Sequence, residues 1–335
     1  MNLASPSLFD LPITPVDVSI IIVSWNTINL LRNCLSSIYQ TTSGVTYEII
    51  VVDNGSTDGS PNMVAGEFPT ARLLRLEVNI GFARANNLGI SVSKGGYICL
   101  VNSDVEMLPG CIDILCAYME SHPEVGVLGP KILNPDLTLQ PSCNGIPTPW
   151  NTLCHALALD SIFPRSSLFG GQFMRFWAHD KIARVGALVG CILMVRKSHL
   201  YAVGLLDERF FMYSEDVDWC KRFHEAGYEV IFMPEAKAIH HGSGSSSSDP
   251  LRFNNEKQRA FLVYWLKHYG RVGQLYMAFV ILLRELVRIV YAVGGYAACP
   301  HNRNHFATIL RKSWWSLSWL FEFGWFSRST YTGHR

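Results

Sequence analysis

The sequence predicts an α/β fold in which a mostly parallel sheet is covered by helices on both faces. Apolar, β-branched runs such as residues 18–23 and 48–52 are too short and too apolar to be surface helices. They alternate with amphipathic segments such as residues 29–39, whose apolar side chains recur every third or fourth position. Strands that alternate with helices through short connections are parallel. At 335 residues the chain is long enough to bury a substantial core.

The order of the elements follows from local signals. Short apolar runs are expected to be strands, and longer amphipathic runs are expected to be helices. The expected strands are residues 18–23, 48–52, 71–76, 97–101, 125–128, 185–195, 229–233 and 236–240. The expected helices are residues 29–39, 79–94, 111–120 and 215–226. Between residues 132 and 184 prolines interrupt the pattern, so we expect a variable loop region that covers a site.

The chain divides into three parts. Residues 1–17 form an N-terminal extension, and residues 18–248 form one domain with a nucleotide-binding half (18–131) and an acceptor and catalytic half (132–248). Residues 249–335 form a helical C-terminal region. The Gly- and Ser-rich stretch 242–248 is either a plain linker or a mobile lid over the site, and the sequence favours neither.

Charge, cysteines and the N-terminus narrow the class of protein. A net charge of +1 provides no global field for nucleic acid, so no nucleic-acid partner is expected. The nine cysteines form no CxxC pair and no metal-finger spacing, and their scatter suits a reducing compartment. Residues 1–17 contain no basic segment followed by an apolar one, so no secretory signal is expected. These features predict a cytoplasmic protein.

The C-terminal helices predict contact with a membrane surface. Residues 254–269 are amphipathic, whereas residues 275–298 are mostly apolar but contain Arg284 and Arg288, four positions apart on one face. Such charges oppose a membrane span and favour a helix that lies on the cytoplasmic face of a bilayer. Arg311 and the aromatic residues after it suit the headgroup zone. The alternative is an apolar helical pair packed on the domain or in a dimer.

Two oxygen donors follow the strand at residues 97–101. Asn102 and Asp104 are two positions apart, so they point the same way if the strand continues. Carboxylates at the carboxyl ends of buried strands occur where open α/β sheets bind ligands. Hard oxygen donors there suit Mg²⁺ or Mn²⁺ bridging the diphosphate of a phosphorylated donor. The alternative for Asp104 is a helix cap, which the intervening Pro109-Gly110 makes less natural.

Other strand and helix ends add candidate ligands. Asp53 follows the strand at residues 48–52 and can accept hydrogen bonds from a base or a ribose. Asp58 is expected instead to cap the short helix that begins near residue 60. The segment from Asn79 begins a helix with Gly81 and Arg84 near its N-terminus, where backbone N–H groups and a guanidinium suit a phosphate. His240 ends the last strand and is either a third metal ligand or structural.

The acidic run Glu215-Asp216-Val217-Asp218 follows the apolar segment 210–213 and opens a helix. Part of this acidity complements the helix dipole, but three acids exceed what capping requires. A carboxylate desolvated by an apolar wall is a suitable general base. Asp216 is expected to be this base, with Glu215 or Asp218 orienting it or contacting the acceptor. Helix geometry sends Asp216 and Asp218 in different directions, so they cannot share one role.

Taken in order, these motifs resemble the family 2 glycosyltransferases with the GT-A fold, and especially their rhamnosyltransferase-like branch. The resemblance covers about residues 18 to 245. The matching stretches are SIIIVSWN (19–26), VVDNGSTDG (51–59), NIGFARANNLG (79–89), LVNSD (100–104), VGCILMVR (189–196), GLLDERFFMYSEDVDWCKR (204–222), AGY (226–228) and HHGS (240–243).

The resemblance implies an inverting transferase that uses a nucleotide-diphosphate sugar and a divalent cation. It implies that Asp104 is the metal carboxylate of a DxD-type element in which Asn102 replaces the first acid, and that His240 matches a metal position of some members. It further implies that Asp216 of the Glu215-Asp216 pair is the base. The donor-binding set is then Ser24, Asn26, Asp53, Asn79, Gly81, Arg84, Asn102 and Asp104.

The branch resembled implies a rhamnose donor carried by dTDP or UDP, and a glycan or lipid-linked acceptor in polysaccharide or cell-envelope synthesis. Two alternative functions compete with this hypothesis. A dinucleotide-using enzyme would carry a glycine-rich loop after the first strand, where this chain has Ser24-Trp25-Asn26-Thr27. A non-catalytic sugar-nucleotide-binding or scaffold protein on the same fold would be expected to lack Asp104 or Asp216.

Overall fold

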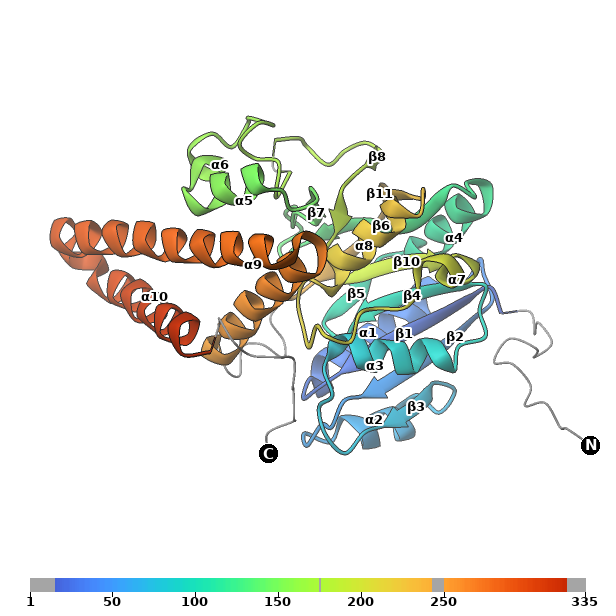
Figure 1. The fold of residues 1–335 in the computed structure, drawn as a ribbon. Coiled ribbons are helices and arrows are strands. Elements are labelled where there is room, and N and C mark those ends of the chain that lie inside the picture. Colours follow the sequence, from blue (N-terminus) through green and yellow to red (C-terminus); the bar gives the residue numbers. More distant parts are fainter. Residues whose placement is uncertain (1–15, 175, 243–249, 324–335) are drawn as a thin grey trace, which may run out of the picture.

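A computed structural model describes residues 16–174, 176–242 and 250–323 of the chain. Its centre is a mixed sheet flanked by helices, from which two long C-terminal helices extend (Figure 1). Residues 243–249, which include most of the Gly- and Ser-rich stretch, lie outside the described residues.

The sheet is mostly parallel, as the alternation of strands and helices predicted. Four parallel strands form one half, β1 (Val18–Ser24), β2 (Tyr47–Asp53), β3 (Arg72–Arg75) and β4 (Tyr97–Asn102). The other half contains β5 (Val105–Met107), β6 (Val125–Leu133), β10 (Ile192–Arg196) and β11 (Glu229–His240), with β8 (Ala183–Arg184) paired to β11. The order is β3-β2-β1-β4-β10-β6-β11-β5. Strand β10 is antiparallel to both β4 and β6.

Alternate side chains of the strands pack into two separate cores. On β1, Ile20 and Ile22 belong to the core under α1 (Ile28–Thr41), α2 (Ser60–Glu67) and α4 (Cys111–Ser121). Ile21 and Val23 belong to the opposite core, under α3 (Phe82–Ser91) and α8 (Glu215–Glu225). Because both faces are buried, the strands are continuous apolar runs in the sequence.

Short elements complete the domain. Strands β7 (Cys143–Asn144) and β9 (Ala187–Leu188) pair with each other. The short helices are α5 (Pro149–Ala156), α6 (Leu159–Ile162) and α7 (Leu200–Val203), with 3₁₀ turns at Lys197–His199 and Pro300–Asn302. The segment predicted as a variable loop region therefore contains β7, α5 and α6.

Several details of the strands differ from the sequence prediction. The predicted strand 185–195 is divided into β9 and β10, and the two-residue strands β7 and β8 were not predicted. Strand β5 was not predicted, because three residues are too few for a periodic signal. Strand β11 is continuous where two strands, 229–233 and 236–240, were predicted. It passes Pro234 through a register shift between Met233 and Lys237, and such irregularities are where a sheet tolerates proline.

The C-terminal helices are α9 (Pro250–Ala298), bent at Gly270, and α10 (Arg303–Phe323), which packs along α9. Gly270 has φ +66°, a left-handed conformation that breaks the helix between the two segments predicted from the sequence. Phe210, Tyr264, Trp265 and Ile281 lie in one buried cluster that joins α9 to the domain. No helix among the described residues is sufficiently long and apolar to cross a membrane.

Candidate active site

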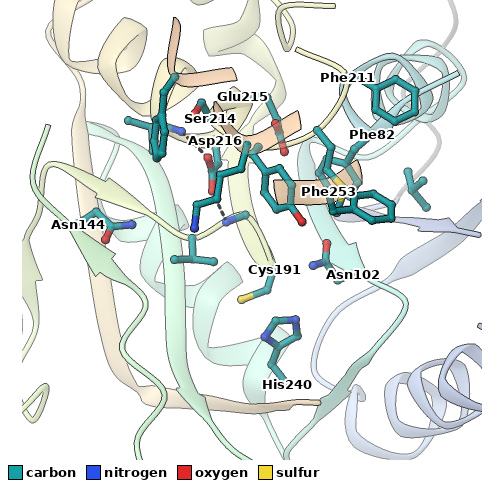
Figure 2. Close-up of a pocket in the computed structure, with 18 of the residues that line it drawn as sticks. Phe82, Asn102, Asn144, Cys191, Phe211, Ser214, Glu215, Asp216, His240 and Phe253 are labelled. Atoms are coloured by element: carbon teal, nitrogen blue, oxygen red, sulfur yellow. Dashed lines mark hydrogen bonds between the residues drawn. The ribbon is translucent and has the colours of Figure 1, made fainter. Parts of the chain in front are cut away.

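A cavity of about 640 Å³ opens at the carboxyl ends of β1 and β4, a volume in the range of small-molecule sites. Both halves of the domain and helix α9 contribute to its lining. Six of the residues predicted to form the site line it together: Asn79, Asn102, Asp104, Glu215, Asp216 and His240. Figure 2 shows the carboxyl groups of Glu215 and Asp216 above Asn102, Cys191 and His240.

Strand pairing explains why Asp104 meets His240. Strand β5 begins one residue after Asp104, and its Val105 pairs with His240 on antiparallel β11. The backbone N–H of His241 donates to the carbonyl oxygen of Asp104 at 2.9 Å. As a result, Nε2 of His240 lies 3.2 Å from Oδ1 of Asp104.

Gln140 sets the tautomer of His240. The Gln140 amide nitrogen donates to Oδ1 of Asn134 at 2.9 Å and to the His240 carbonyl at 3.2 Å, so its Oε1 is the atom that faces Nδ1 of His240, at 2.6 Å. That oxygen accepts a hydrogen bond from the Nδ1–H group, so in the neutral ring Nε2 carries no proton and has a free lone pair. Two lone-pair atoms, Nε2 and Oδ1 of Asp104, then face each other across 3.2 Å. A cation or a proton between them removes this repulsion, so the donor set fits a divalent metal ion.

Asn102 adds a second side-chain oxygen to the same part of the cavity lining. Its Oδ1 is buried and has no hydrogen-bond partner among the described residues. The described residues contain no group of three or more His, Cys, Asp or Glu side chains arranged to hold a metal. For a divalent ion such as Mg²⁺ or Mn²⁺, this part of the chain would supply two strong ligands, Asp104 and His240, and the ion would need further oxygen ligands from outside the protein.

Asp216 is fixed by two backbone N–H groups. Gly190 donates to its Oδ2 and Val217 to its Oδ1, both at 2.8 Å. Gly190 reaches this position because Asn102 N donates to the carbonyl of neighbouring Cys191 at 2.9 Å, at the start of antiparallel β10. Burial raises the pKa of Asp216, while the hydrogen bonds from Gly190 and Val217 oppose that rise. A raised pKa improves a carboxylate as a proton acceptor.

Glu215 is more deeply buried than its neighbour. It is 5% exposed, and its Oε2 has no hydrogen-bond partner among the described residues. Burial first, and the Asp216 charge second, raise the pKa of Glu215 well above its usual value. The preceding Tyr213 and Ser214 have φ values of +71° and +63°, so this segment holds a conformation that costs energy for non-glycine residues.

Asp218 has no part in the cavity. It is fully buried and accepts contacts from Arg222 at 2.9 Å, Lys267 at 2.6 Å and His268 at 2.8 Å. These contacts lower the pKa of Asp218 against the effect of burial. Asp218 therefore joins α8 to α9, and the interpretation that it orients the base or contacts the acceptor does not hold.

Gly81 and Asn79 lie at the start of α3, which contacts the segment that precedes α8 at Phe211. Gly81 has φ +93°, which starts α3 at Phe82 instead of the predicted residue 79. A Cβ on Gly81 would lie 2.8 Å from the carbonyl oxygen of Phe211, the atom that accepts a hydrogen bond from Phe82 N at 2.6 Å. The side chain of Asn79 accepts from Gly81 N and from the amide of Asn54, both at 3.0 Å.

Five residues of the predicted donor-binding set lie outside the cavity lining, and one of them is Gly81, described above. Ser24 is hydrogen-bonded to Thr27 at 3.0 Å, and Asn26 accepts from Thr57 N at 2.8 Å. Asp53 accepts from Ser56 N at 3.2 Å, and its other oxygen is buried with no hydrogen-bond partner among the described residues. Arg84 is exposed and pairs with Glu208 at 3.2 Å.

Asp58 caps two helices. Its Oδ1 accepts from Ser60 N at 3.0 Å, as the prediction of a cap near residue 60 required, and its Oδ2 accepts from Ile28 N at the start of α1 at 2.8 Å.

Several lining residues were not predicted. They are Trp25, Asn54, Asn144, Gln172, Phe173, Gly190, Tyr213, Phe253, Lys257 and Phe261. Phe253, Lys257 and Phe261 are spaced four apart, so they lie on one face of α9, and this spacing was a signal in the sequence. The periodicity of the sequence does not show which surface that face of the helix packs against, because this depends on the tertiary structure.

Comparison with known proteins finds similarity to glycosyltransferases. The Glycosyl transferase family 2 model matches residues 19–142. The N-acetylglucosaminyl-diphospho-decaprenol L-rhamnosyltransferase of Mycobacterium tuberculosis is 34% identical over 213 residues, which cover 60% of this chain and 69% of that protein. The low-salt glycan biosynthesis hexosyltransferase Agl10 of Haloferax volcanii is 26% identical over 246 residues, covering 72% and 71%.

Two solved structures share the fold. The mannosyltransferase PcManGT from Pyrobaculum calidifontis, in complex with GDP-Man and Mn²⁺, has a TM-score of 0.55 at 14% identity, covering 94% of this chain and 92% of that one. GalNAc-T7 with UDP, GalNAc and Mn²⁺ also has a TM-score of 0.55, at 16% identity. The alignment covers 76% of this chain and about half, 49%, of GalNAc-T7.

The fold is therefore the GT-A fold of glycosyltransferases, as predicted. The chain belongs to glycosyltransferase family 2. The prediction of a glycosyltransferase is confirmed at this level.

Proposed function

We propose that this enzyme is an inverting transferase that moves a hexose, with rhamnose as the first candidate, from a nucleotide-diphosphate sugar to a hydroxyl of a lipid-diphosphate-linked glycan. The observation that supports this most directly is the placement of the Asp104–His240 pair and Asp216 in one cavity. The name of the mycobacterial relative, a rhamnosyltransferase acting on a diphospho-decaprenol, supports the sugar and the acceptor class. The nucleotide of the donor is dTDP or UDP.

The proposed reaction is one displacement. Asp216 takes the proton of the acceptor hydroxyl, whose oxygen forms a bond to the anomeric carbon. The bond between that carbon and the diphosphate oxygen breaks, and its electron pair leaves with the diphosphate. A single displacement inverts the anomeric configuration, and it requires no second carboxylate as nucleophile.

Asp104 and His240 would hold Mg²⁺ or Mn²⁺ with the donor diphosphate, supported by the Mn²⁺ in the two similar structures. Such an ion neutralises negative charge on a leaving diphosphate. Gln140 keeps the His240 ring oriented, and Gly190 keeps Asp216 pointed at the cavity.

The proposed location is the cytoplasmic face of the membrane, with the C-terminal helices at the surface. An exposed apolar stripe on α9, formed by Val272, Leu275, Phe279, Leu286, Val290 and Val293, supports contact with lipid. Trp314, 72% exposed on α10, is a typical interfacial anchor. None of the nine cysteines, all among the described residues, is in a disulfide, which suits a reducing compartment.

Asp216→Asn tests the proposed reaction. Replacing the base by an isosteric amide should lower the rate of transfer by about two to four orders of magnitude. The donor Kd, measured by titration with Mn²⁺ present, should stay within a factor of two or so of the wild-type value, because Asp216 contacts only the acceptor. A comparable loss of donor affinity would make Asp216 a donor-binding group instead of the base.

Val272→Asp with Phe279→Asp tests the location. Co-sedimentation with vesicles that contain anionic lipid should fall for this variant, since both side chains are exposed and bury no core. The matched control is Val78→Asp, a substitution at a 65% exposed valine between β3 and α3. Equal sedimentation of all three proteins would contradict the membrane proposal.

A further inference from the structure

A second cavity adjoins the active site. It has a volume of about 390 Å³ and lies between α9 and the α5–α6 segment. Lys257 lines both cavities, so the second one begins where the acceptor side of the active site ends. None of the roles assigned above uses it.

Three cationic side chains line the second cavity. Lys257, Arg284 and Arg288 line it, and Asp160 is the acid among its described lining residues. Behind the two arginines, fully buried Glu285 accepts from Nη2 of Arg284 at 2.7 Å and from Nη1 of Arg288 at 3.4 Å. Counting Glu285, three positive and two negative groups leave an excess of one positive charge. Arg284 and Arg288, which the sequence places on one face of the helix, both line this cavity.

Glu285 orients the two guanidinium groups without using all of their donors. Glu285 accepts hydrogen bonds from Nε and Nη2 of Arg284 and from Nη1 of Arg288. The other N–H groups of both side chains have no hydrogen-bond partner among the described residues. Planar donors fixed in this way suit the oxygens of a phosphate, and Arg binds phosphate in a bidentate manner.

Two further groups lack partners in the described structure. Lys257 has no ion pair there, and burial first and Arg284 second lower the pKa of its ammonium group. Gln258 is 1% exposed, and both its amide nitrogen and its amide oxygen lack hydrogen-bond partners among the described residues. A buried amide without partners costs free energy, and a ligand that supplies partners repays that cost.

We propose that the second cavity binds the diphosphate of the acceptor, while the acceptor sugar reaches past Lys257 to Asp216. Lys257, Arg284 and Arg288 would contact the phosphate oxygens, and the Gln258 amide would donate a hydrogen bond to them. This inference rests on the proposed function, because it names the group that a lipid-diphosphate-linked acceptor presents.

Direct binding tests the inference without turnover. Full-length protein is titrated calorimetrically with farnesyl diphosphate in EDTA, which prevents metal-dependent binding at the donor site. Farnesol and inorganic pyrophosphate are titrated in parallel. We expect saturable binding of farnesyl diphosphate and weaker binding of pyrophosphate, with no binding of farnesol. Equal binding of farnesol would overturn the inference, and binding of pyrophosphate as tight as that of farnesyl diphosphate would assign the site to free phosphate.

Two variants test the assigned residues. Gln258→Glu places a carboxylate in the cavity without removing a hydrogen bond, and Arg288→Gln removes one cation. Each should weaken farnesyl diphosphate binding by about tenfold or more, the effect of one charge-assisted contact. Arg271→Gln, a cation-to-amide change on the exposed side of α9, is the matched control and should leave binding unchanged. Binding unaffected by Gln258→Glu would overturn the inference even if Arg288→Gln fails to fold.

Transfer assays separate failure of the inference from failure of the proposed function. If wild-type protein glycosylates a lipid-diphosphate sugar and both variants do so with unchanged KM, the inference is wrong and the proposed function stands. If wild-type protein binds farnesyl diphosphate as expected but transfers no sugar to a lipid-diphosphate acceptor, the anion site stands and the proposed acceptor is wrong.

Discussion

The backbone N–H of Gly190 donates a 2.8 Å hydrogen bond to Oδ2 of Asp216. This contact ties the start of β10 to the first turn of α8, two elements that are far apart in sequence. Gly190 is the residue that allows it. A Cβ at this position would lie 3.1 Å from Cβ of Asp216 and 3.3 Å from its Oδ2.

Gly190→Ala should therefore displace Asp216 while leaving the fold intact. A misplacement of a few tenths of an ångström to about 1 Å should lower kcat by about tenfold to a hundredfold. Steady-state kinetics with saturating donor and acceptor measure this effect. Gly66→Ala, where no atom lies within 4 Å of the added Cβ, is the control. A Gly190→Ala enzyme with full kcat would show that the position of Asp216 is not critical.

Gln140→Leu should weaken metal binding although Gln140 is not itself a ligand. It removes the acceptor that keeps the Nδ1 proton of His240 in place. Loss of such a supporting contact typically costs about 10- to 100-fold in metal affinity. The Mn²⁺ concentration for half-maximal activity should rise by that factor, with recovery of most activity at saturating Mn²⁺. EDTA should abolish activity of both proteins, and metal-independent activity would contradict the assignment of Asp104 and His240.

The rate of transfer should fall at low pH. Asp216 acts as a base only when it is ionised, and burial raises its pKa above the usual 3.8. Activity is therefore full above the raised pKa and is lost as pH falls through it, so the acidic limb should lie above the range of an ordinary aspartate. Plots of log kcat against pH between 4 and 8, roughly, measure this limb. An acidic limb at or below the ordinary aspartate range would show that Asp216 is not shifted in the working enzyme.

Glu215→Gln should stabilise the protein at neutral pH. The pKa of Glu215 is raised in the folded state, so folding favours its protonated form. The corresponding stability is present below the pKa of the unfolded chain and is lost as pH rises through the folded-state pKa. An amide avoids this loss, and the free energy of unfolding at pH 7 or so should rise by about 1–2 kcal/mol.

Denaturant unfolding of both proteins at neutral and acidic pH checks this expectation, since the difference should shrink at acidic pH. A variant less stable than wild type at neutral pH would show that the Glu215 carboxylate has favourable partners. Lower activity with higher stability would place Glu215 among residues kept for function at a cost in stability.

The sequence was sufficient to predict the parallel half of the sheet and the acidic residues at its edge. Buried strands are apolar throughout, so β1, β2 and β4 were visible as runs, and Asp104 and Asp216 stood out as charges beside them. The pairing of Asp104 with His240 was not visible. It depends on β5, a strand of three residues whose register with β11 sets the contact.

Conformation also limited the prediction. From the sequence, Gly81 was interpreted as a phosphate-binding residue. The structure also shows a steric reason for glycine at this position, because Phe211 approaches it closely. Likewise, the sequence does not show that Glu285 is buried as the common partner of Arg284 and Arg288. Contacts of this kind depend on the final packing of elements that are remote in the chain.

Helix α9 supplies Phe253, Lys257 and Phe261 to the active-site cavity and, beyond its bend at Gly270, the exposed stripe that begins at Val272. The C-terminal region therefore cannot be exchanged without changing the active-site cavity. Grafting it from a relative would replace part of the active-site cavity together with the proposed membrane-contact surface, so chimaeric enzymes should inherit substrate preference and any membrane binding as one unit.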